Sequence, residues 1–356
     1  MRQLGLLTAA VLSLALVGTL AVVRSFRGPV TVTTTATTTT TPATTTTIAH
    51  ERPQAGWAVA TSSARGVMVD YKIIDVSGVM FRAIRLHART TLLRWHVGSQ
   101  DPPTRPGEVP ADAASSINWP NEGLAGVVAV FNGGFKVSAN AGGSMVDGVT
   151  LSAMVRGNMT IAIDAAGHWK MGLWEPDFPG PHFHAIAYRQ NLGPLVADGR
   201  VTAAARASAL LWGSPLKNNP LEPRTAIGLD AHGNLVYVAT MQGITPAPLA
   251  QALVLAGASE GMQLDINPYW PILGASFEVL HQPGFMPVQI PFAEHSPSIY
   301  NAGWERDFFV AMAEPNSWRC SWTSAGLATS SGVAQPQRLH EVCAGARASP
   351  AISLAG

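Results

Sequence analysis

Residues 126–135 read Gly-Val-Val-Ala-Val-Phe-Asn-Gly-Gly-Phe, and this stretch decides the fold class. The unbroken apolar run up to Phe131 is typical of a strand buried on both faces. The run stops at Asn132, and the paired Gly133 and Gly134 would allow backbone N–H groups to converge on an anion. Asn-Gly-Gly is also an ordinary tight turn, so the stretch predicts a buried strand and leaves the role of its end open.

Much of the surrounding sequence predicts further short strands separated by Gly, Pro and Asx turns. Strands are expected at Met68–Ile74, Met80–His87 and Leu92–Val97, where apolar and β-branched residues cluster. Two hairpins are expected at residues 164–167 and 230–233, because each has an Asp that can start a turn and a Gly that accepts positive φ.

The clearest helix is predicted over Pro246–Ala256. Thr245 can cap it, proline suits its first turn, and Gly257 supplies a left-handed stop. We therefore expect an α+β fold, with strand-rich mixed sheets and a few packed helices. This fold would form a single catalytic-type domain over residues 56–314.

Two later strands carry a charged group in an apolar context. Arg224 lies within an apolar strand, and its planar guanidinium matches a phosphate or a carboxylate; a structural ion pair with Glu222 is the alternative. Asp265 lies near the end of the apolar run 261–266, so burial should raise its pKa unless Arg224 lies nearby. Such a carboxyl suits acid/base or nucleophilic chemistry on a glycoside, although a strand-terminal Asp is also a common turn or cap residue.

Taken together, these segments resemble the phosphodiester glycosidase family over about residues 126–265. The family pattern is an Asn-Gly-Gly-Phe turn, a Pro-Arg-Thr-Ala-Ile-Gly strand, a helix rich in Leu and Ala, and a Leu-Asp-Gly-Gly-Gly-Ser loop. The corresponding segments here are Phe131–Phe135, Pro223–Asp230, the helix from Pro246, and Met262–Asp265. A weaker likeness continues in a closing strand at residues 307–310.

The resemblance implies an exported hydrolase that acts on a sugar 1-phosphodiester. Carried over position by position, it assigns roles only to residues that match the family motifs. The implied residues are Asp265, Arg224 and Asn132 as catalytic groups, and Gly133, Gly134 and Thr225 as substrate-binding groups.

The sequence departs from the family pattern directly after Asp265. Residues 266–268 are Ile-Asn-Pro where the pattern has three glycines, and these cannot bring backbone amides as close to a phosphate. Tyr269 and Trp270 could compensate as a sugar-stacking, substrate-binding platform, or could simply belong to the core.

The N-terminal region predicts export. Residues 4–23 are uncharged and mostly apolar, and at about 1.5 Å per residue they are long enough to span a bilayer. No Ala-x-Ala-like site follows, so we expect an uncleaved transmembrane signal anchor with residues 1–3 in the cytoplasm; a cleaved signal would leave the protein secreted.

Residues 24–55 are expected to be a Thr-rich disordered stalk, because 13 of the 17 residues from 31 to 47 are threonine and offer little to bury. The domain would then lie on the extracytoplasmic side of the cell membrane.

Residues 315–356 are expected to form a C-terminal tail that holds both cysteines. Cys320 and Cys343 suggest one disulfide in an exported chain, or two free thiols.

His182 and His184 could offer half of a metal site, but no third ligand is identifiable. No metal and no cofactor are expected.

The composition argues against nucleic acid as a partner. Charged residues make up 13% of the chain and the formal net charge is +1, so no basic surplus points to nucleic acid. The leading hypothesis is an exported hydrolase that cleaves a sugar 1-phosphodiester in cell-envelope polysaccharide or glycolipid, with this sugar-phosphate glycan as its partner. The alternative is a non-catalytic envelope-glycan binding protein that kept the fold, which the altered loop after Asp265 motivates.

Overall fold

A computed structural model describes residues 56–63, 65–105, 108–109, 113–117, 126–213, 219–275 and 288–314. The chain divides into two units, Met1–Ala49 and His50–Gly356, and all described residues belong to the second. The predicted anchor, stalk and tail, with Cys320 and Cys343, lie outside the described residues. Within the described part, no helix has the length and apolar character needed to cross a membrane.

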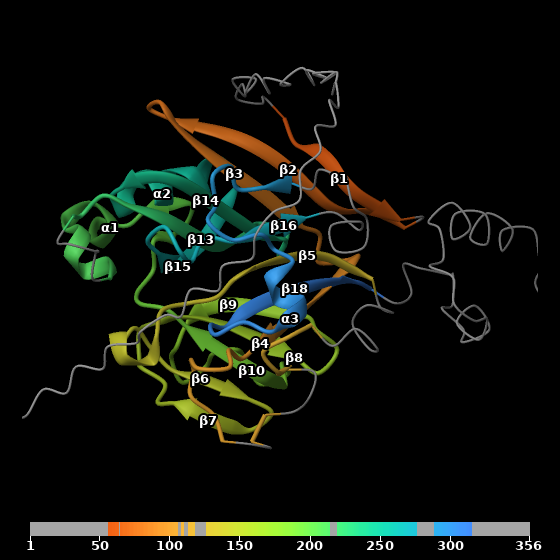
Figure 1. The fold of residues 1–356 in the computed structure, drawn as a ribbon. Coiled ribbons are helices and arrows are strands. Elements are labelled where there is room, and N and C mark those ends of the chain that lie inside the picture. The colour runs from red at the N-terminus through yellow and green to blue at the C-terminus, as the bar shows by residue number, and fades with distance from the viewer. Residues whose placement is uncertain are drawn as a thin grey trace, which may run out of the picture. The chain divides into compact units, whose positions relative to one another are not determined.

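The largest sheet has eight strands in the order β1-β2-β3-β14-β13-β15-β11-β12 (Figure 1). Neighbouring strands pair antiparallel throughout this sheet. Its strands are β1 Ala58–Ser63, β2 Gly66–Val76, β3 Val79–Leu86, β14 Leu235–Ile244, β13 Glu222–Asp230, β15 Ala258–Ile266, β11 Val196–Ala197 and β12 Arg200–Val201.

Two five-stranded sheets accompany it, with the orders β17-β16-β5-β18-β4 and β7-β6-β10-β8-β9. We call them the β5–β18 sheet and the β8–β10 sheet. The first contains β17 Val288–Gln289, β16 Leu273–Ala275, β5 Val127–Asn132, β18 Phe308–Ala313 and β4 Thr91–His96. The second contains β7 Val149–Ser152, β6 Ser144–Val146, β10 Ala185–Gln190, β8 Met159–Asp164 and β9 Trp169–Leu173.

The helices are few and short. They are α1 Ala203–Ala207, α2 Pro246–Leu255 and α3 Ile299–Ala302, with the 3-10 turns η3 Val137–Ala139 and η4 Ala209–Trp212. Figure 1 shows α1 and α2 on one side of the eight-stranded sheet, beside β13 and β14.

Side chains on the two faces of the central strands belong to two hydrophobic cores. Ile227 and Tyr237 join a large cluster that also holds Phe131 of the β5–β18 sheet and Ile161 of the β8–β10 sheet, so the three sheets meet there. On the opposite face, alternate residues of β13 and β14 pack with helix α2 in a second cluster. Because successive side chains of a strand point to opposite faces, each central strand contributes to both cores.

The predicted strand-rich fold with a few short helices is confirmed, but the prediction that its sheets are mixed was wrong. Every strand pair of the three sheets among the described residues is antiparallel. In consecutive pairs such as β2–β3 and β13–β14, a short turn returns the chain antiparallel, whereas a parallel neighbour would need a long crossover.

Local signals explain much of this outcome. Both predicted hairpins form, with the N–H of Gly167 donating to the Asp164 carbonyl and that of Gly233 to the Asp230 carbonyl, each at 3.0 Å. The glycines have φ of +99° and +77°, as the turns require. Helix α2 also forms where predicted, although the Thr245 side chain makes no capping hydrogen bond.

A prediction on α2 tests this packing. Leu253 is fully buried, and a Cβ at Gly261 of β15 would lie 2.7 Å from its Cδ1, so glycine makes room for this side chain. Leu253→Ala should lower the free energy of unfolding by about 2–5 kcal/mol. The matched control, Leu255→Ala, removes a side chain that is 47% exposed and should change stability by less than about 0.5 kcal/mol. Equal costs in chemical denaturation would show that α2 does not seal this face.

Candidate active site

A β-bulge places Asp265. Ala226 of β13 lies opposite Gln263, and Arg224 lies opposite Ile266, so β15 advances three residues while β13 advances two. The N–H of Asp265 leaves this ladder and donates to the Gly133 carbonyl at 3.0 Å. Bulges re-aim side chains next to functional sites, and this one turns the end of β15 toward the β5–β18 sheet.

The Asp265 carboxylate forms a buried ion pair with Arg306. Its Oδ2 lies 2.7 Å from Arg306 Nη2, and the two side chains are 7% and 5% exposed. Nη2 also donates to the Gly134 carbonyl at 2.8 Å. The other carboxylate oxygen, Oδ1, accepts from the Ile266 N–H at 2.9 Å.

Burial dominates the protonation of Asp265. Loss of hydration raises the pKa of this carboxyl to about 7, with a smaller upward contribution from the charge of Asp307, while Arg306, the Ile266 amide and Arg189 act in the opposite direction. A carboxyl that titrates near neutral pH can both give and accept a proton under physiological conditions.

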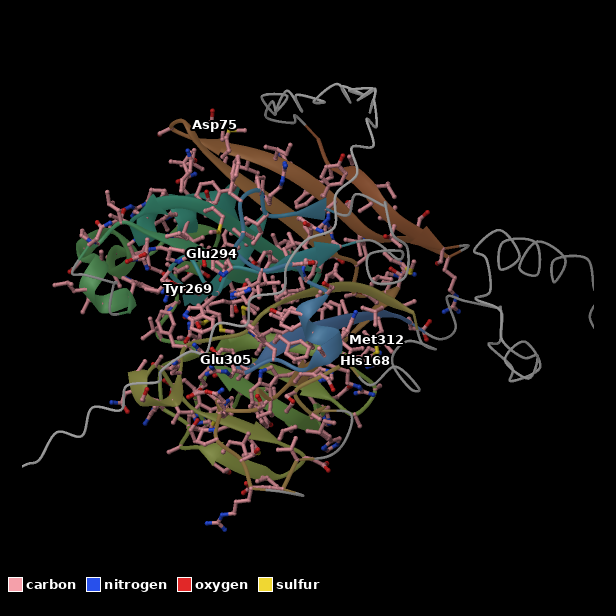
Figure 2. All side chains as sticks on the ribbon, in the orientation of Figure 1. Asp75, His168, Tyr269, Glu294, Glu305 and Met312 are labelled. Atoms are coloured by element: carbon pink, nitrogen blue, oxygen red, sulfur yellow. The ribbon has the colours of Figure 1, made fainter. Side chains whose placement is uncertain are left out.

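Aromatic side chains cover the ion pair. The Arg306 guanidinium lies 4.6 Å from the centre of the Trp270 ring, which is half-buried. Trp270 packs against Trp304 at 6.2 Å and against Tyr269, which is 50% exposed, at 6.3 Å. Figure 2 labels Tyr269 and Glu305, the neighbours of Trp270 and Arg306 in sequence.

A second buried carboxylate lies beside the first. Asp307 pairs with Arg189 of β10, and both side chains are at most 1% exposed. Three N–H groups donate to its Oδ2 atom: Arg189 Nε at 2.8 Å, Trp95 Nε1 at 3.0 Å and the Gly134 amide at 3.1 Å. Arg189 Nη2 reaches the other oxygen at 3.3 Å, so both oxygens of Asp307 are engaged inside the protein.

Two of the sequence-predicted residues, Asn132 and Thr225, form one hydrogen-bond chain with the backbone of Asp265. Asn132 Nδ2 donates to Thr225 Oγ1 at 2.9 Å, and Thr225 Oγ1 donates to the Asp265 carbonyl at 2.9 Å. Asn132 Oδ1 accepts from the Tyr237 hydroxyl at 2.8 Å. The polar groups of Asn132 and Thr225 therefore hold the end of β15 in place.

Gly133 and Gly134 are glycines because of close packing. Neither has positive φ. A Cβ at Gly133 would overlap the Asp307 carboxylate, and one at Gly134 would lie 2.7 Å from Arg189 Nη2. Their N–H groups donate to the carbonyl and to the carboxylate of Asp307, at 2.8 Å and 3.1 Å.

Arg224 lies apart from the Asp265 carboxylate. Burial lowers the pKa of Arg224 to about 10, with the charge of Glu222 acting against this. Its N–H groups donate to four oxygens: the carbonyls of Ile244, Trp212 and Pro220 at 2.9, 3.0 and 3.3 Å, and Gln263 Oε1 at 2.8 Å. These hydrogen bonds connect the start of β13 and the end of β14 to the segments around Trp212 and Pro220.

The departure from the family pattern has a visible consequence in the backbone. Asn267 has a φ of +76°, a conformation that glycine adopts readily and that asparagine tolerates better than most residues. Its Oδ1 accepts from the Tyr269 N–H at 3.2 Å. One of the three replaced positions thus has a left-handed backbone conformation without glycine.

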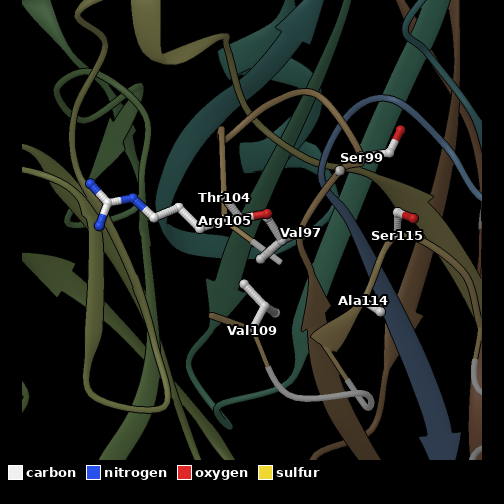
Figure 3. A pocket seen from close by; sticks show the side chains of 8 residues that line it. Val97, Ser99, Thr104, Arg105, Val109, Ala114 and Ser115 are labelled. Atoms are coloured by element: carbon white, nitrogen blue, oxygen red, sulfur yellow. The ribbon is translucent and has the colours of Figure 1, made fainter. Parts of the chain in front are cut away.

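A cavity and a pair of histidines are two further features of the described structure. A cavity of about 310 Å³ is lined by residues between Val97 and Ser115, and in Figure 3 the Arg105 side chain points away from the other labelled side chains. None of its lining residues was predicted from the sequence. His182 and His184 are exposed, and no group of three or more potential metal ligands occurs within the described ranges.

Sequence reasoning missed Arg306, Arg189 and the role of Asp307. The only signal was the weak likeness around residues 307–310, which marks the strand but not the charges before it. Arg189 lies at the end of a strand with no distinctive motif, and its partner is 118 residues away.

The family match covers Asn132, Arg224 and Asp265 of this site, but not Arg306. Residues 125–265 match the family model described as phosphodiester glycosidase, which ends at the candidate acid. The resemblance seen in the sequence is therefore confirmed for residues 125–265, which match the phosphodiester glycosidase family.

Solved structures give more distant similarities. The catalytic domain of zebrafish N-acetylglucosamine-1-phosphodiester alpha-N-acetylglucosaminidase, auto-inhibited by its pro-peptide, is 15% identical, with a TM-score of 0.42 over 72% of this chain and 87% of that chain. A hypothetical protein from Synechocystis is 11% identical, with a TM-score of 0.42 over 69% and 62%. A putative exported protein from Burkholderia pseudomallei is 12% identical, with a TM-score of 0.31 over 70% and 75%. No curated protein matches.

A glycine substitution tests the close packing at the site. Gly133→Ala would force its Cβ into the Asp307 carboxylate, so we expect a loss of at least about 2 kcal/mol in unfolding free energy. Gly193→Ala is the matched control, because no atom lies within 4 Å of its Cβ position and its φ is not positive. If thermal melting shows the two variants to be equally stable, Asp307 does not pack against Gly133 as described.

Proposed function

We propose that this protein is an exported hydrolase that cleaves a sugar 1-phosphodiester in cell-envelope polysaccharide or glycolipid at the Asp265–Arg306 pair. The family domain supports hydrolysis of sugar phosphodiesters. The observation that carries the assignment of the site is Asp265 itself: a buried carboxyl with a pKa of about 7, held against a guanidinium and covered by an aromatic ring.

The chemistry follows from these groups. Hydrolysis breaks the bond between the anomeric carbon and the phosphate oxygen; water supplies the hydroxyl of the released sugar and the proton of the phosphate monoester. Asp265 can take part as acid/base or as nucleophile. Arg306 is the guanidinium available to an anionic phosphate oxygen, since Arg189 is engaged by Asp307. Tyr269, which is 50% exposed, offers a ring face for a sugar beside Trp270, whose ring also contacts Arg306.

The remaining predicted residues receive supporting roles in this proposal. Asn132 and Thr225 position Asp265 through its backbone. Gly133 and Gly134 let Asp307 approach, and Arg224 fixes the start of β13. The phosphate-binding role that the sequence suggested for Arg224 passes to Arg306, because Nε, Nη1 and Nη2 of Arg224 donate to protein oxygens.

Features of the sequence support the proposed location. The apolar segment 4–23 and the Thr-rich segment after it are typical of a membrane anchor and a stalk. A domain attached in this way would reach polymers and lipids of the cell envelope.

Turnover tests the proposal directly. The full chain, incubated with an N-acetylglucosamine-1-phosphodiester, should release free sugar, and Asp265→Asn should lower kcat by at least about 100-fold. Asp198→Asn is the matched control: Asp198 is exposed with a φ of +50°, which asparagine tolerates, and it should retain full activity. Full activity of Asp265→Asn would remove Asp265 from the mechanism.

A second function rests on the loop after Asp265. Since Ile-Asn-Pro replaces three glycines there, the domain could bind an envelope glycan without cleaving it. Tight glycan binding that survives Asp265→Asn, with no sugar released by either protein, would favour this binding protein over the hydrolase.

A further inference from the structure

Among the described residues, two buried donors near Asp265 lack an acceptor. Tyr300 of helix α3 is 0% exposed, and its hydroxyl has no hydrogen-bond partner in the described part of the chain. Arg306 Nε is buried and lacks a partner there as well, although Nη2 of the same guanidinium binds Asp265. Buried polar groups are nearly always hydrogen-bonded, so two unpaired donors in one region call for an explanation.

Packing fixes the Tyr300 ring next to the segment that carries Arg306. The ring stacks on Phe308 at 4.1 Å and 15°, and Phe308 stacks on His96 at 4.7 Å and 16°. Arg306 and Phe308 are two residues apart in an extended segment, so their side chains lie on the same side of it. Tyr300 is therefore stacked over the side of the segment from which the guanidinium projects.

The electrostatic environment joins Tyr300 to the site. Burial raises the pKa of Tyr300 well above 10; the neighbouring Tyr237, Asp307 and Asp265 add to the rise, and Arg306 opposes it. The hydroxyl therefore keeps its proton at neutral pH and remains a donor.

We infer that Tyr300 is a further ligand-binding residue, whose hydroxyl donates, together with Arg306 Nε, to an anionic oxygen of the bound phosphodiester. This inference rests on the proposed function. An anionic acceptor fits because one of the two donors carries a positive charge, and hydrogen bonds between charged groups are stronger than neutral ones.

Binding of a sugar phosphate tests this role apart from catalysis. The full chain is titrated calorimetrically with N-acetylglucosamine 1-phosphate. Tyr300→Phe should weaken Kd by about tenfold or more, the effect of losing one hydrogen bond to a charged group. Tyr71→Phe is the matched control, because Tyr71 is a half-buried tyrosine of β2 outside the site, and its Kd should equal that of the unmodified protein.

Thermal melting separates a ligand-binding hydroxyl from a structural one. Tyr300→Phe removes a hydroxyl without a partner, so its Tm should be unchanged or higher. Tyr237→Phe removes a hydroxyl that donates to Asn132 at 2.8 Å, so its Tm should fall. A weaker Kd at an unchanged or higher Tm supports the inference.

Three results would overturn the inference. The first is an unchanged Kd in Tyr300→Phe, as expected if the hydroxyl only holds a water molecule. The second is weakened binding accompanied by a lower Tm, which would make Tyr300 a core residue. The third is an absence of binding by the unmodified protein. The turnover assay on the same protein then shows independently whether the hydrolase proposal stands.

Discussion

The burial of Asp307 is the constraint on which the site depends. Its carboxylate sits without water exposure among donors from three parts of the fold: Arg189 of β10, Trp95 of β4 and the amide that follows β5. A buried charge of this kind is costly unless it is paired and hydrogen-bonded, so these elements must hold their positions together. Residues 133 and 134 must then be glycine, since any side chain there would displace Asp307 or Arg189.

This arrangement divides the two adjacent acids into different roles. Asp307 accepts four hydrogen bonds from side chains and backbone inside the protein. Within the described part of the chain, the Asp265 carboxylate accepts only from the Ile266 N–H and from Arg306 Nη2, which it shares with the Gly134 carbonyl, and burial raises its pKa to about 7. The guanidinium of Arg306 is itself only partly used, because its Nε lacks an acceptor in the described structure. The unsaturated pair is therefore the better candidate for chemistry, and the saturated pair is its scaffold.

Local sequence signals could predict the elements but not the pairing of the charges. The apolar run before Asn132 and the two Asp-x-x-Gly turns determine strands and hairpins within a few residues, so both were predictable. Asp265 was also predictable, because a carboxyl at the end of an apolar strand is expected to be desolvated. Arg306 and Arg189 were not, since their partners lie far away in sequence and only the packing of three sheets brings them together.

Arg224 shows a different limit of the sequence. Its motif and its burial were recognised, but a buried guanidinium can be satisfied by carbonyl oxygens as well as by a ligand, and sequence does not distinguish the two. The bulge in β15 could not be predicted from the sequence either. It determines where Asp265 points, but it arises from the register of two strands, and no residue pattern in the sequence indicates it.

The central claim is that Asp265 is a buried carboxyl able to exchange a proton near neutral pH. Its direct test is a carbon-13 NMR titration of the aspartate side-chain carboxyl carbons in the full chain, with Asp265→Asn used to assign the signal. We expect the Asp265 signal to titrate with a pKa of about 7. A midpoint at or below the ordinary aspartate value of about 3.9 would show that Arg306 holds Asp265 ionised, and would contradict its role as a proton-exchanging group.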